Sequence, residues 1–137
     1  MGLFREYDLR GIVGTELTME IAERLGRTYA TLVRAKGIQT IALGRDGRLS
    51  SPGLRDSLLR GLLAGGLHVV DIGVCASPLL YFSLFRLPVE GGIMITGSHN
   101  AAEYNGFKIC IGKEAIHGKE IQELRAVMDS GVGVNAD

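Results

Sequence analysis

Apolar side chains recur every three or four positions between residues 19 and 36, which is the spacing of one buried face of an α-helix. Thr18 stands just before this segment as a candidate N-cap, and Gly37 stands just after it as a stop signal. The pattern therefore predicts a long helix over 19–36.

Two serine-proline pairs mark the start of further helices. A serine can cap a helix while the proline that follows it occupies the first turn. Ser51-Pro52 precedes an amphipathic segment that ends at a pair of glycines, and Ser77-Pro78 precedes a shorter one over 79–85. A last helix is predicted over 119–128.

Short apolar runs lie between the predicted helices, as expected for buried strands. Asn105-Gly106 is a turn signal, and it predicts that the last strand runs antiparallel to its neighbour. Strands separated by helices of this length imply crossover connections, with helices on both faces of the sheet. We therefore predict an α/β fold, a three-layer α/β/α sandwich around a mixed, mostly parallel sheet. The predicted strands span 7–13, 40–43, 68–72, 92–96 and 107–111.

The length of 137 residues and a hydrophobic fraction of 46% fit one domain with a substantial core. We assign residues 1–130 to this domain. The glycine-rich residues 131–137 are typical of a linker and are predicted to begin a connection to a second domain.

Charge narrows the classes of partner. Fifteen basic residues balance fifteen acidic ones, whereas a nucleic-acid binder usually has a basic footprint.

No apolar run reaches the ~18–20 residues of a membrane span, and the N-terminus lacks the apolar core of a signal peptide. Cys75 and Cys110 lie among apolar neighbours, as reduced cysteines do. We expect a cytoplasmic protein with neither a nucleic-acid nor a membrane partner.

Polar residues follow several predicted strands, at the sheet edge where α/β proteins bind ligands. They lie in the segments 7–11, 44–48, 96–100 and 104–108. These segments contain a hydroxyl, an imidazole, an ammonium and several guanidinium groups, without an excess of carboxylates. Such a set favours an anionic ligand over a metal ion held by protein alone.

Ser98 is the candidate nucleophile, because Gly97 permits a sharp turn directly after a strand. A serine hydroxyl needs a nearby base or a group already attached to it. Lys108 is the nearest proton carrier, provided that its strand returns beside the Ser98 loop. Two simpler interpretations stay open at this point: 96–100 is an ordinary polar loop, and 45–48 is a turn with a surface ion pair.

Several enzyme classes lack their motifs. No G-x-G-x-x-G follows a predicted strand, the lysine near Gly112 has the wrong spacing for a phosphate-binding loop, and Ser98 is not in a G-x-S-x-G sequence. These absences disfavour a dinucleotide-binding enzyme, a P-loop enzyme and a serine hydrolase.

Four motifs together resemble the α-D-phosphohexomutase family, in its phosphomannomutase/phosphoglucomutase branch. Thr96-Gly97-Ser98-His99-Asn100 is similar to the phosphoserine loop of the family, and Gly44-Arg45-Asp46-Gly47-Arg48 to its Gly-Arg-Asp-x-Arg turn. The other two are Phe4-Arg5-Glu6-Tyr7-Asp8-Leu9-Arg10-Gly11 and Tyr104-Asn105-Gly106-Phe107-Lys108. The motifs follow the order of the family. One position differs: Ala101 stands where the family loop continues with proline.

The resemblance implies the N-terminal domain of a four-domain enzyme that interconverts the 1- and 6-phosphates of mannose or glucose. It implies that Ser98 carries the transferred phosphoryl group, that Lys108 moves the proton and that His99 holds the phosphoserine. It further implies that Tyr7, Arg10, Arg48 and Lys108 bind the sugar phosphate, with Arg10 also catalytic. Mg²⁺ would be bound through the phosphoryl group of Ser98 and through aspartates of a second domain, and a hexose 1,6-bisphosphate would be the intermediate and activator.

Two alternatives remain on the sequence alone. The chain could be a phosphosugar-binding module without catalysis, or part of a phosphoglucosamine mutase, although the latter usually begins the serine loop with Ser-Ala-Ser. As an isolated domain it is expected to be inactive. It would also expose surfaces that pack against the rest of the chain, so that self-association of the fragment is possible.

Overall fold

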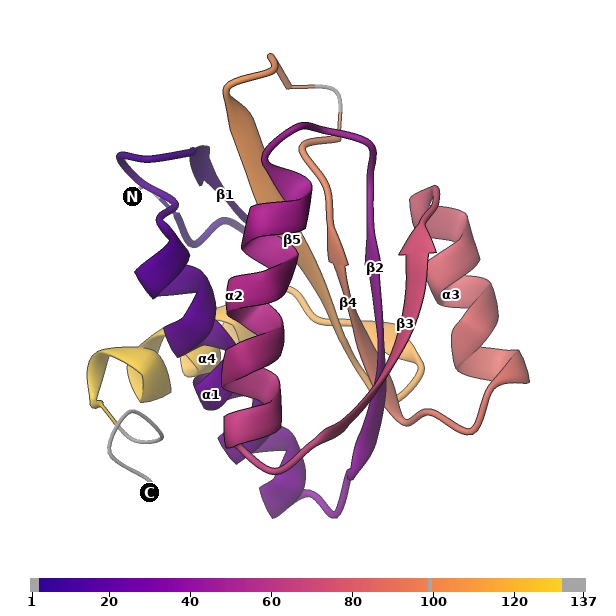
Figure 1. Cartoon of the computed structure of the whole chain (residues 1–137). Helices are drawn as coiled ribbons and strands as arrows, with labels where there is room; N and C mark the ends of the chain where they lie inside the picture. The colour runs from indigo at the N-terminus through magenta and orange to yellow at the C-terminus, as the bar shows by residue number, and fades with distance from the viewer. Residues whose placement is uncertain (1–2, 99, 132–137) are drawn as a thin grey trace.

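The computed structural model describes residues 3–98 and 100–131 (Figure 1). Ten elements follow one another along the chain. They are β1 (Leu9–Ile12), α1 (Met19–Ala35), β2 (Thr40–Arg45), α2 (Ser51–Ala64), β3 (His68–Val74), α3 (Ser77–Arg86), β4 (Gly91–Ile95), β5 (Tyr104–Ile111), β6 (Glu114–Ala115) and α4 (Lys119–Asp129).

One six-stranded sheet organises the domain, in the order β1-β5-β4-β2-β3 with β6 paired to β5. β2 is parallel to both β3 and β4, whereas β5 is antiparallel to β1, β4 and β6. β5 therefore runs against all the other strands, which share one direction. The predicted mixed, mostly parallel sheet is confirmed.

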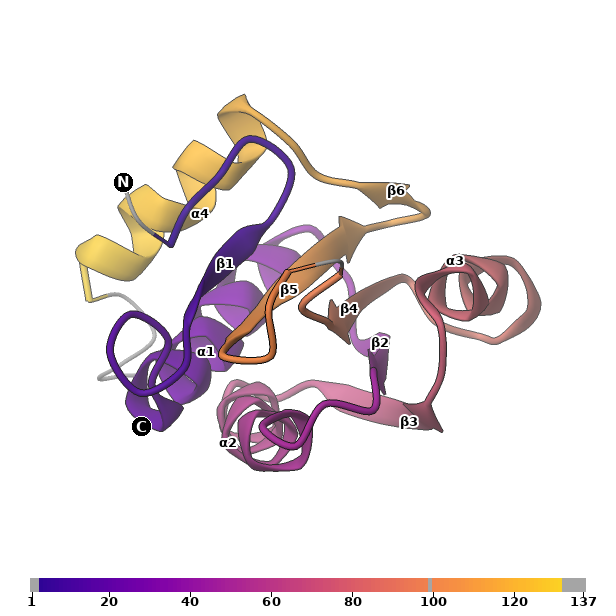
Figure 2. The same cartoon turned by 90° about the horizontal axis from the view of Figure 1, so that it is seen from above.

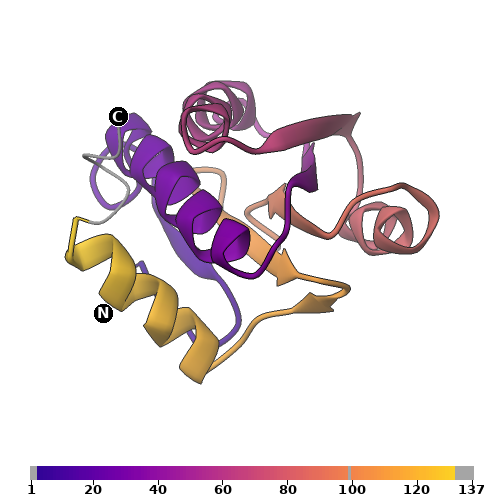
Figure 3. The ribbon, with the colours of Figure 1, turned by 90° about the horizontal axis from the view of Figure 1, so that it is seen from below.

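Helices cover both faces of this sheet. The larger hydrophobic core joins α1, α2 and α4 to one face, through residues such as Leu25, Leu58 and Leu124. The smaller core joins Leu80 and Leu84 of α3 to the other face. Figures 2 and 3 show α3 on the opposite side of the sheet from α1 and α2. The three-layer architecture follows from these two cores.

The first helix begins and ends where its sequence signals predict. The Oγ1 atom of Thr18 accepts a hydrogen bond from the backbone N–H of Ile21 at 3.1 Å, as an N-cap does. Gly37 follows the helix with a φ of 86°, a left-handed value that glycine adopts without a Cβ penalty.

The serine-proline signals are each wrong by one residue. Ser51 and Ser77 are the first helical residues, and the N-cap positions belong to Ser50 and Ala76. The hydroxyl of Ser51 is drawn away from a capping role because it donates a 2.7 Å hydrogen bond to Oδ1 of Asp46. Proline consequently occupies the second position of each helix.

The Asn105-Gly106 turn is also wrong. Both residues lie inside β5, opposite Gly11 and Arg10 of β1. The side chain of Asn105 is fully buried, and its amide donates to the hydroxyls of Ser50 and Ser51 at 2.8 and 3.0 Å. The antiparallel direction predicted for this strand is correct, but residues 96–103 make the reversal.

The α1–α2 contact depends on two glycines. A Cβ on Gly61 would overlap the carbonyl oxygen of Glu23, and a Cβ on Gly26 would overlap the carbonyl oxygen of Leu58. The two backbones are therefore in direct contact, which Figure 1 shows as two helices lying side by side.

Both cysteines are free, as predicted. Burial raises the pKa of Cys110 to about 11, and partial burial raises the pKa of Cys75. Both thiols therefore remain protonated at neutral pH. Separately, no helix in the described part of the chain is long and apolar enough to cross a bilayer.

Candidate functional site

Three charged side chains gather on one face of the sheet, on the two strands β1 and β5. Leu9 and Phe107 are register partners and both belong to the larger core. Because side chains alternate across a strand, the neighbouring Asp8, Arg10 and Lys108 project to the opposite face. This is the face on which α3 packs against β2 and β4.

A buried carboxylate joins the two cations. Asp8 is 5% exposed, with Oδ1 3.2 Å from Nη2 of Arg10 and Oδ2 3.7 Å from Nζ of Lys108. A buried charge is costly unless it is paired, so Asp8 needs both partners. It in turn holds them toward the same place on the sheet.

Arg10 links this cluster to the loop that follows β4. Its Nη1 donates a 2.9 Å hydrogen bond to Oδ1 of Asn100. Its Nε is buried and has no hydrogen-bond partner among the described residues. The buried Nε is closed to a ligand, but the bonds to Asn100 and Asp8 use only one N–H of each Nη group, and a guanidinium with further Nη donors suits an anionic ligand.

Ser98 occupies the same loop in an uncommon backbone conformation. Its side chain is exposed, and its φ of 54° is the one positive value outside glycine in the described part of the chain. Such a left-handed conformation costs a residue with a side chain about 1–2 kcal/mol. The backbone N–H of Ser98 donates to Oγ1 of Thr96 at 3.0 Å, which helps to hold the turn.

Arg48 holds the remainder of this loop from the neighbouring β2–α2 connection. Its guanidinium donates to the backbone carbonyls of Ser98 at 3.1 Å, Asn100 at 2.8 Å, Ala101 at 2.8 Å and Tyr104 at 3.3 Å. Its Nε donates to Oδ2 of Asp46 at 3.2 Å. These bonds occupy all five N–H donors of the guanidinium.

Asp46 holds the other side of the serine. Its Oδ2 accepts a hydrogen bond from the backbone N–H of Gly97 at 3.0 Å, and its Oδ1 accepts from the backbone N–H of Arg48 and the hydroxyl of Ser51. Partial burial acts to raise the pKa of Asp46. Hydrogen bonds from Ser51, Arg48, Gly97 and Thr96 outweigh that effect and lower the pKa. The carboxylate is therefore ionised throughout the neutral range.

The sequence matches the family model for "Phosphoglucomutase/phosphomannomutase, alpha/beta/alpha domain I" over residues 1–131. The chain belongs to this family.

Individual relatives agree with the family model. A phosphoglucomutase from Neisseria gonorrhoeae is 46% identical over 135 residues, covering 98% of this chain and 29% of that protein. A phosphomannomutase/phosphoglucomutase from Pseudomonas aeruginosa is 43% identical over 136 residues, covering 96% and 29%. A crystal structure of a phosphoglucomutase/phosphomannomutase family protein from Burkholderia thailandensis matches with a TM-score of 0.91 at 38% identity, covering 96% of this chain and 30% of that one. The chain thus spans less than a third of the length of these relatives.

The mutase motifs of the sequence meet at one end of the sheet. The connection from β2 to α2 lies beside the connection from β4 to β5 (Figure 1), and Arg48 joins them. Arg10 and Lys108 are joined through Asp8, and Arg10 reaches the serine loop through Asn100. Ser98, Lys108 and Arg10 thus belong to one region, as the resemblance implies.

The remaining predicted site residues are Tyr7, His99 and Arg48. Tyr7 is largely exposed, and its ring lies 6.1 Å from the ring of His117. Its role toward a sugar phosphate stays a prediction, and His99 lies outside the described residues. The substrate-binding role of Arg48 likewise stays a prediction; in this structure its guanidinium donates to the serine loop and to Asp46.

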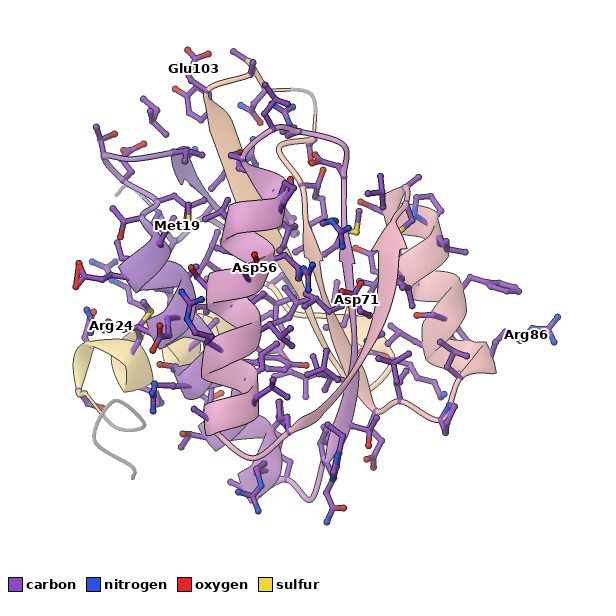
Figure 4. The ribbon with its side chains drawn as sticks, in the orientation of Figure 1. Met19, Arg24, Asp56, Asp71, Arg86 and Glu103 are labelled. Carbon is purple, nitrogen blue, oxygen red and sulfur yellow. The ribbon has the colours of Figure 1, made fainter. Side chains whose placement is uncertain are left out.

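Arg45 belongs to another ion-pair cluster. Its guanidinium lies 3.5 Å from Oδ1 of Asp71, while Arg55 lies 3.5 Å from Oδ2 of the same carboxylate. Figure 4 shows Asp71 on β3, on the part of the sheet beside α2. The two arginines of the mutase turn therefore separate: Arg45 pairs within the sheet, and Arg48 turns to the serine loop.

Sequence reasoning missed two residues of this region. Asp8 lies within a quoted motif, and its alternation with Leu9 is the signal that would have placed it beside Arg10. Tyr81 of α3 packs against the smaller core on this face of the sheet, and its pKa is raised by burial and, to a smaller extent, by Cys110 and Asp8. No sequence signal indicates Tyr81, because only the packing of α3 brings it there.

Metal-ligating side chains are sparse around the serine. Within residues 3–98 and 100–131, no group of three or more histidine, cysteine, aspartate or glutamate side chains is placed to hold a metal ion. The nearby Asp46 carboxylate is already occupied by four hydrogen bonds.

Proposed function

We propose that residues 1–130 form the N-terminal, serine-bearing domain of a longer phosphohexomutase, with 131–137 beginning the linker to the next domain. The complete enzyme would interconvert hexose 1-phosphate and hexose 6-phosphate, of mannose or glucose, in the cytoplasm. The observation that carries the proposal is an exposed Ser98 on a strained turn, in a loop whose Asn100 accepts a hydrogen bond from Arg10. The names and greater length of the relatives support it.

The proposed reaction moves one phosphoryl group in each direction. First, the bond between phosphorus and Oγ of Ser98 breaks while a bond forms between phosphorus and a sugar hydroxyl oxygen. The proton of that hydroxyl is released, and Oγ of Ser98 regains one, so the products are a free serine and a hexose 1,6-bisphosphate. After the bisphosphate turns round, the reverse transfer at its other phosphate regenerates phosphoserine and releases the isomer.

Different side chains of this domain have different roles in the proposed phosphoryl transfer. Lys108 carries the proton between the sugar hydroxyl and Oγ of Ser98. Arg10 offers its remaining donors to a phosphate, and phosphoryl transfer depends mostly on such positioning and charge neutralisation. Asp8 keeps both cations on the same face of the sheet.

Magnesium fits this site only in part. Mg²⁺ is usually bound through one or two carboxylates together with phosphate oxygens. A phosphoryl group on the exposed Ser98 would provide the oxygen, and the carboxylates would come from outside the described residues. When bound, the ion would supply charge neutralisation at the phosphoryl group.

Peptide mass spectrometry of the full-length protein purified from cells tests the proposal. Ser98 is expected to carry a phosphoryl group that disappears on incubation with glucose 1-phosphate or mannose 1-phosphate. Ser98→Ala should abolish turnover, while Ser77→Ala, at the start of α3, should leave it unchanged. An unphosphorylated Ser98, even after treatment with glucose 1,6-bisphosphate and magnesium, would instead indicate a binding module without catalysis.

A further inference from the structure

We propose that Arg48 and Asp46 form a positioning bracket that holds Ser98 in its left-handed backbone conformation. This inference rests on the proposed function. Arg48 then acts on the nucleophile through the backbone and is not a ligand of the sugar phosphate.

The bracket holds the peptide on both sides of the serine. Upstream, Asp46 accepts the backbone N–H of Gly97 at 3.0 Å. Downstream, Arg48 binds the carbonyl oxygen of Ser98 itself at 3.1 Å and that of Asn100 at 2.8 Å. The intervening peptide between Gly97 and Ser98 is held by the bond from the backbone N–H of Ser98 to Oγ1 of Thr96 at 3.0 Å. With the backbone held before and after it, a residue that would otherwise leave the left-handed region is kept there.

The bracket is itself rigidly mounted. The ion pair between Arg48 and Asp46 has side chains only 18% and 21% exposed. Asp46 also accepts the hydroxyl of Ser51, which in turn accepts the buried amide of Asn105 from β5. A chain of hydrogen bonds therefore connects the serine loop to the buried start of β5.

The lack of a side chain at Gly97 leaves space for the guanidinium of Arg48. A Cβ at this position would overlap Cζ and Nε of the Arg48 guanidinium. Gly97 does not have a positive φ, so its backbone conformation is open to other residues. Glycine leaves room for the guanidinium directly against the backbone, and a larger residue would force the end of the Arg48 side chain to move.

A bracket and a phosphate ligand predict different defects. Loss of a phosphate ligand weakens binding of the sugar phosphate, whereas a displaced nucleophile slows the transfer while binding is retained. A displacement of about 1 Å at the reacting atom can reduce a rate about 100-fold.

The test measures a single turnover of phosphoryl transfer from phosphorylated Ser98 to glucose 1-phosphate in the full-length protein. Arg48→Lys keeps the positive charge but loses the planar guanidinium with its several N–H donors. Asp46→Asn keeps the shape of the side chain but loses the negative charge. Each is expected to slow transfer about 10–100-fold at saturating sugar, with less than about a twofold change in the Kd for the sugar phosphate. Arg60→Met is the matched control: Arg60 also pairs with a carboxylate, Glu23 of α1, but its side chain is 62% exposed. Its rate should not change.

A double-mutant cycle keeps the test independent of general instability. Gly97→Ala should slow transfer in the presence of Arg48, and should add no further loss once Arg48 is replaced by Ala, since the overlapping group is gone. Wild-type transfer in Arg48→Lys, or a weakened Kd with an unchanged rate, would overturn the bracket.

Hydrogen exchange separates this inference from the proposed function. If the wild-type protein transfers no phosphate from Ser98, the proposed function fails. The bracket can still be tested by measuring the hydrogen-exchange rates of the backbone amides of residues 96–104. Exchange at least about tenfold faster in Arg48→Lys than in wild type is expected, and unchanged exchange would refute the bracket.

Discussion

Asp8 and Lys108 approach within 3.7 Å from adjacent antiparallel strands, with the carboxylate buried and the ammonium partly exposed. The same carboxylate contacts Arg10, so one acidic group attracts two cations and offsets part of their mutual repulsion. The order of this face of the sheet therefore depends on Asp8.

Asp8→Asn removes the charge and keeps the shape. We expect phosphoryl transfer in the full-length protein to fall at least about tenfold, because Arg10 and Lys108 lose the group that aligns them. The free energy of unfolding should fall by about 1–3 kcal/mol, as both partners are partly solvated. Asp129→Asn, which breaks the exposed pair with Arg125, is the control and should change neither quantity.

Asp46 gives the stability of the protein a defined dependence on pH. Its pKa is lower in the folded state than the ordinary value of 3.8, so the native protein binds fewer protons than the unfolded chain. Its contribution is fully present above that value and is lost as the pH falls through the lower, folded-state pKa.

Urea unfolding at pH 6 and pH 3 checks this linkage. Wild type should lose more unfolding free energy between the two pH values than Asp46→Asn does, because the remaining carboxylates are common to both proteins. Equal losses would show that Asp46 is not held more strongly as the anion.

Gly61 and Gly53 lie in the same helix and should respond in opposite ways to alanine. At Gly61 a methyl group overlaps the backbone of α1, so we expect about 1–3 kcal/mol of destabilisation. At Gly53 the nearest atom is Sδ of Met19 at 3.6 Å, an ordinary contact, so alanine should stabilise by about 0.5–1 kcal/mol. Figure 4 shows Met19 at the start of α1. Denaturant titration of the two variants measures both signs, and a stabilised Gly61→Ala would contradict the close approach of the helices.

Tyr29→Phe tests the connection between α1 and β5. The buried hydroxyl donates a 2.7 Å hydrogen bond to the carbonyl of Cys110, and burial keeps the pKa of this phenol far above its usual range. Its removal leaves that carbonyl with one partner fewer and should cost about 1–2 kcal/mol of unfolding free energy. A variant as stable as wild type would show that the bond makes no net contribution.

The fold was largely predictable from local signals. Thr18 and Gly37 set the ends of α1 because capping and left-handed glycine are properties of a few neighbouring residues. Ser51 and Asn105 were misassigned because their side chains serve long-range hydrogen bonds, and a turn or cap propensity does not include such partners. Tertiary contacts outweighed local preference at both positions.

The loops that form the candidate site could be predicted from the sequence, whereas the contacts of individual residues within it could be predicted less well. Ser98, Arg10 and Lys108 follow from motif order and from the ends of strands. The hydrogen bonds from Arg48 to the loop carbonyls follow only from the packing of two connections, so the sequence could not indicate them, and the substrate-binding role predicted for Arg48 stays a prediction. Asp8 required the register between β1 and β5, which pairs residues almost a hundred positions apart.

The reversed strand has a consequence for how the protein is made. β5 lies between β1 and β4, so β1 finds its partner only after synthesis has passed Ile111. Until then β1 lacks its pairing with β5, and contacts between residues so far apart in the sequence are slow to form. The same event brings Lys108 to Asp8 and Arg10. Completion of the sheet and assembly of the charged site thus depend on the same strand, and a nascent chain that ends before β5 has neither.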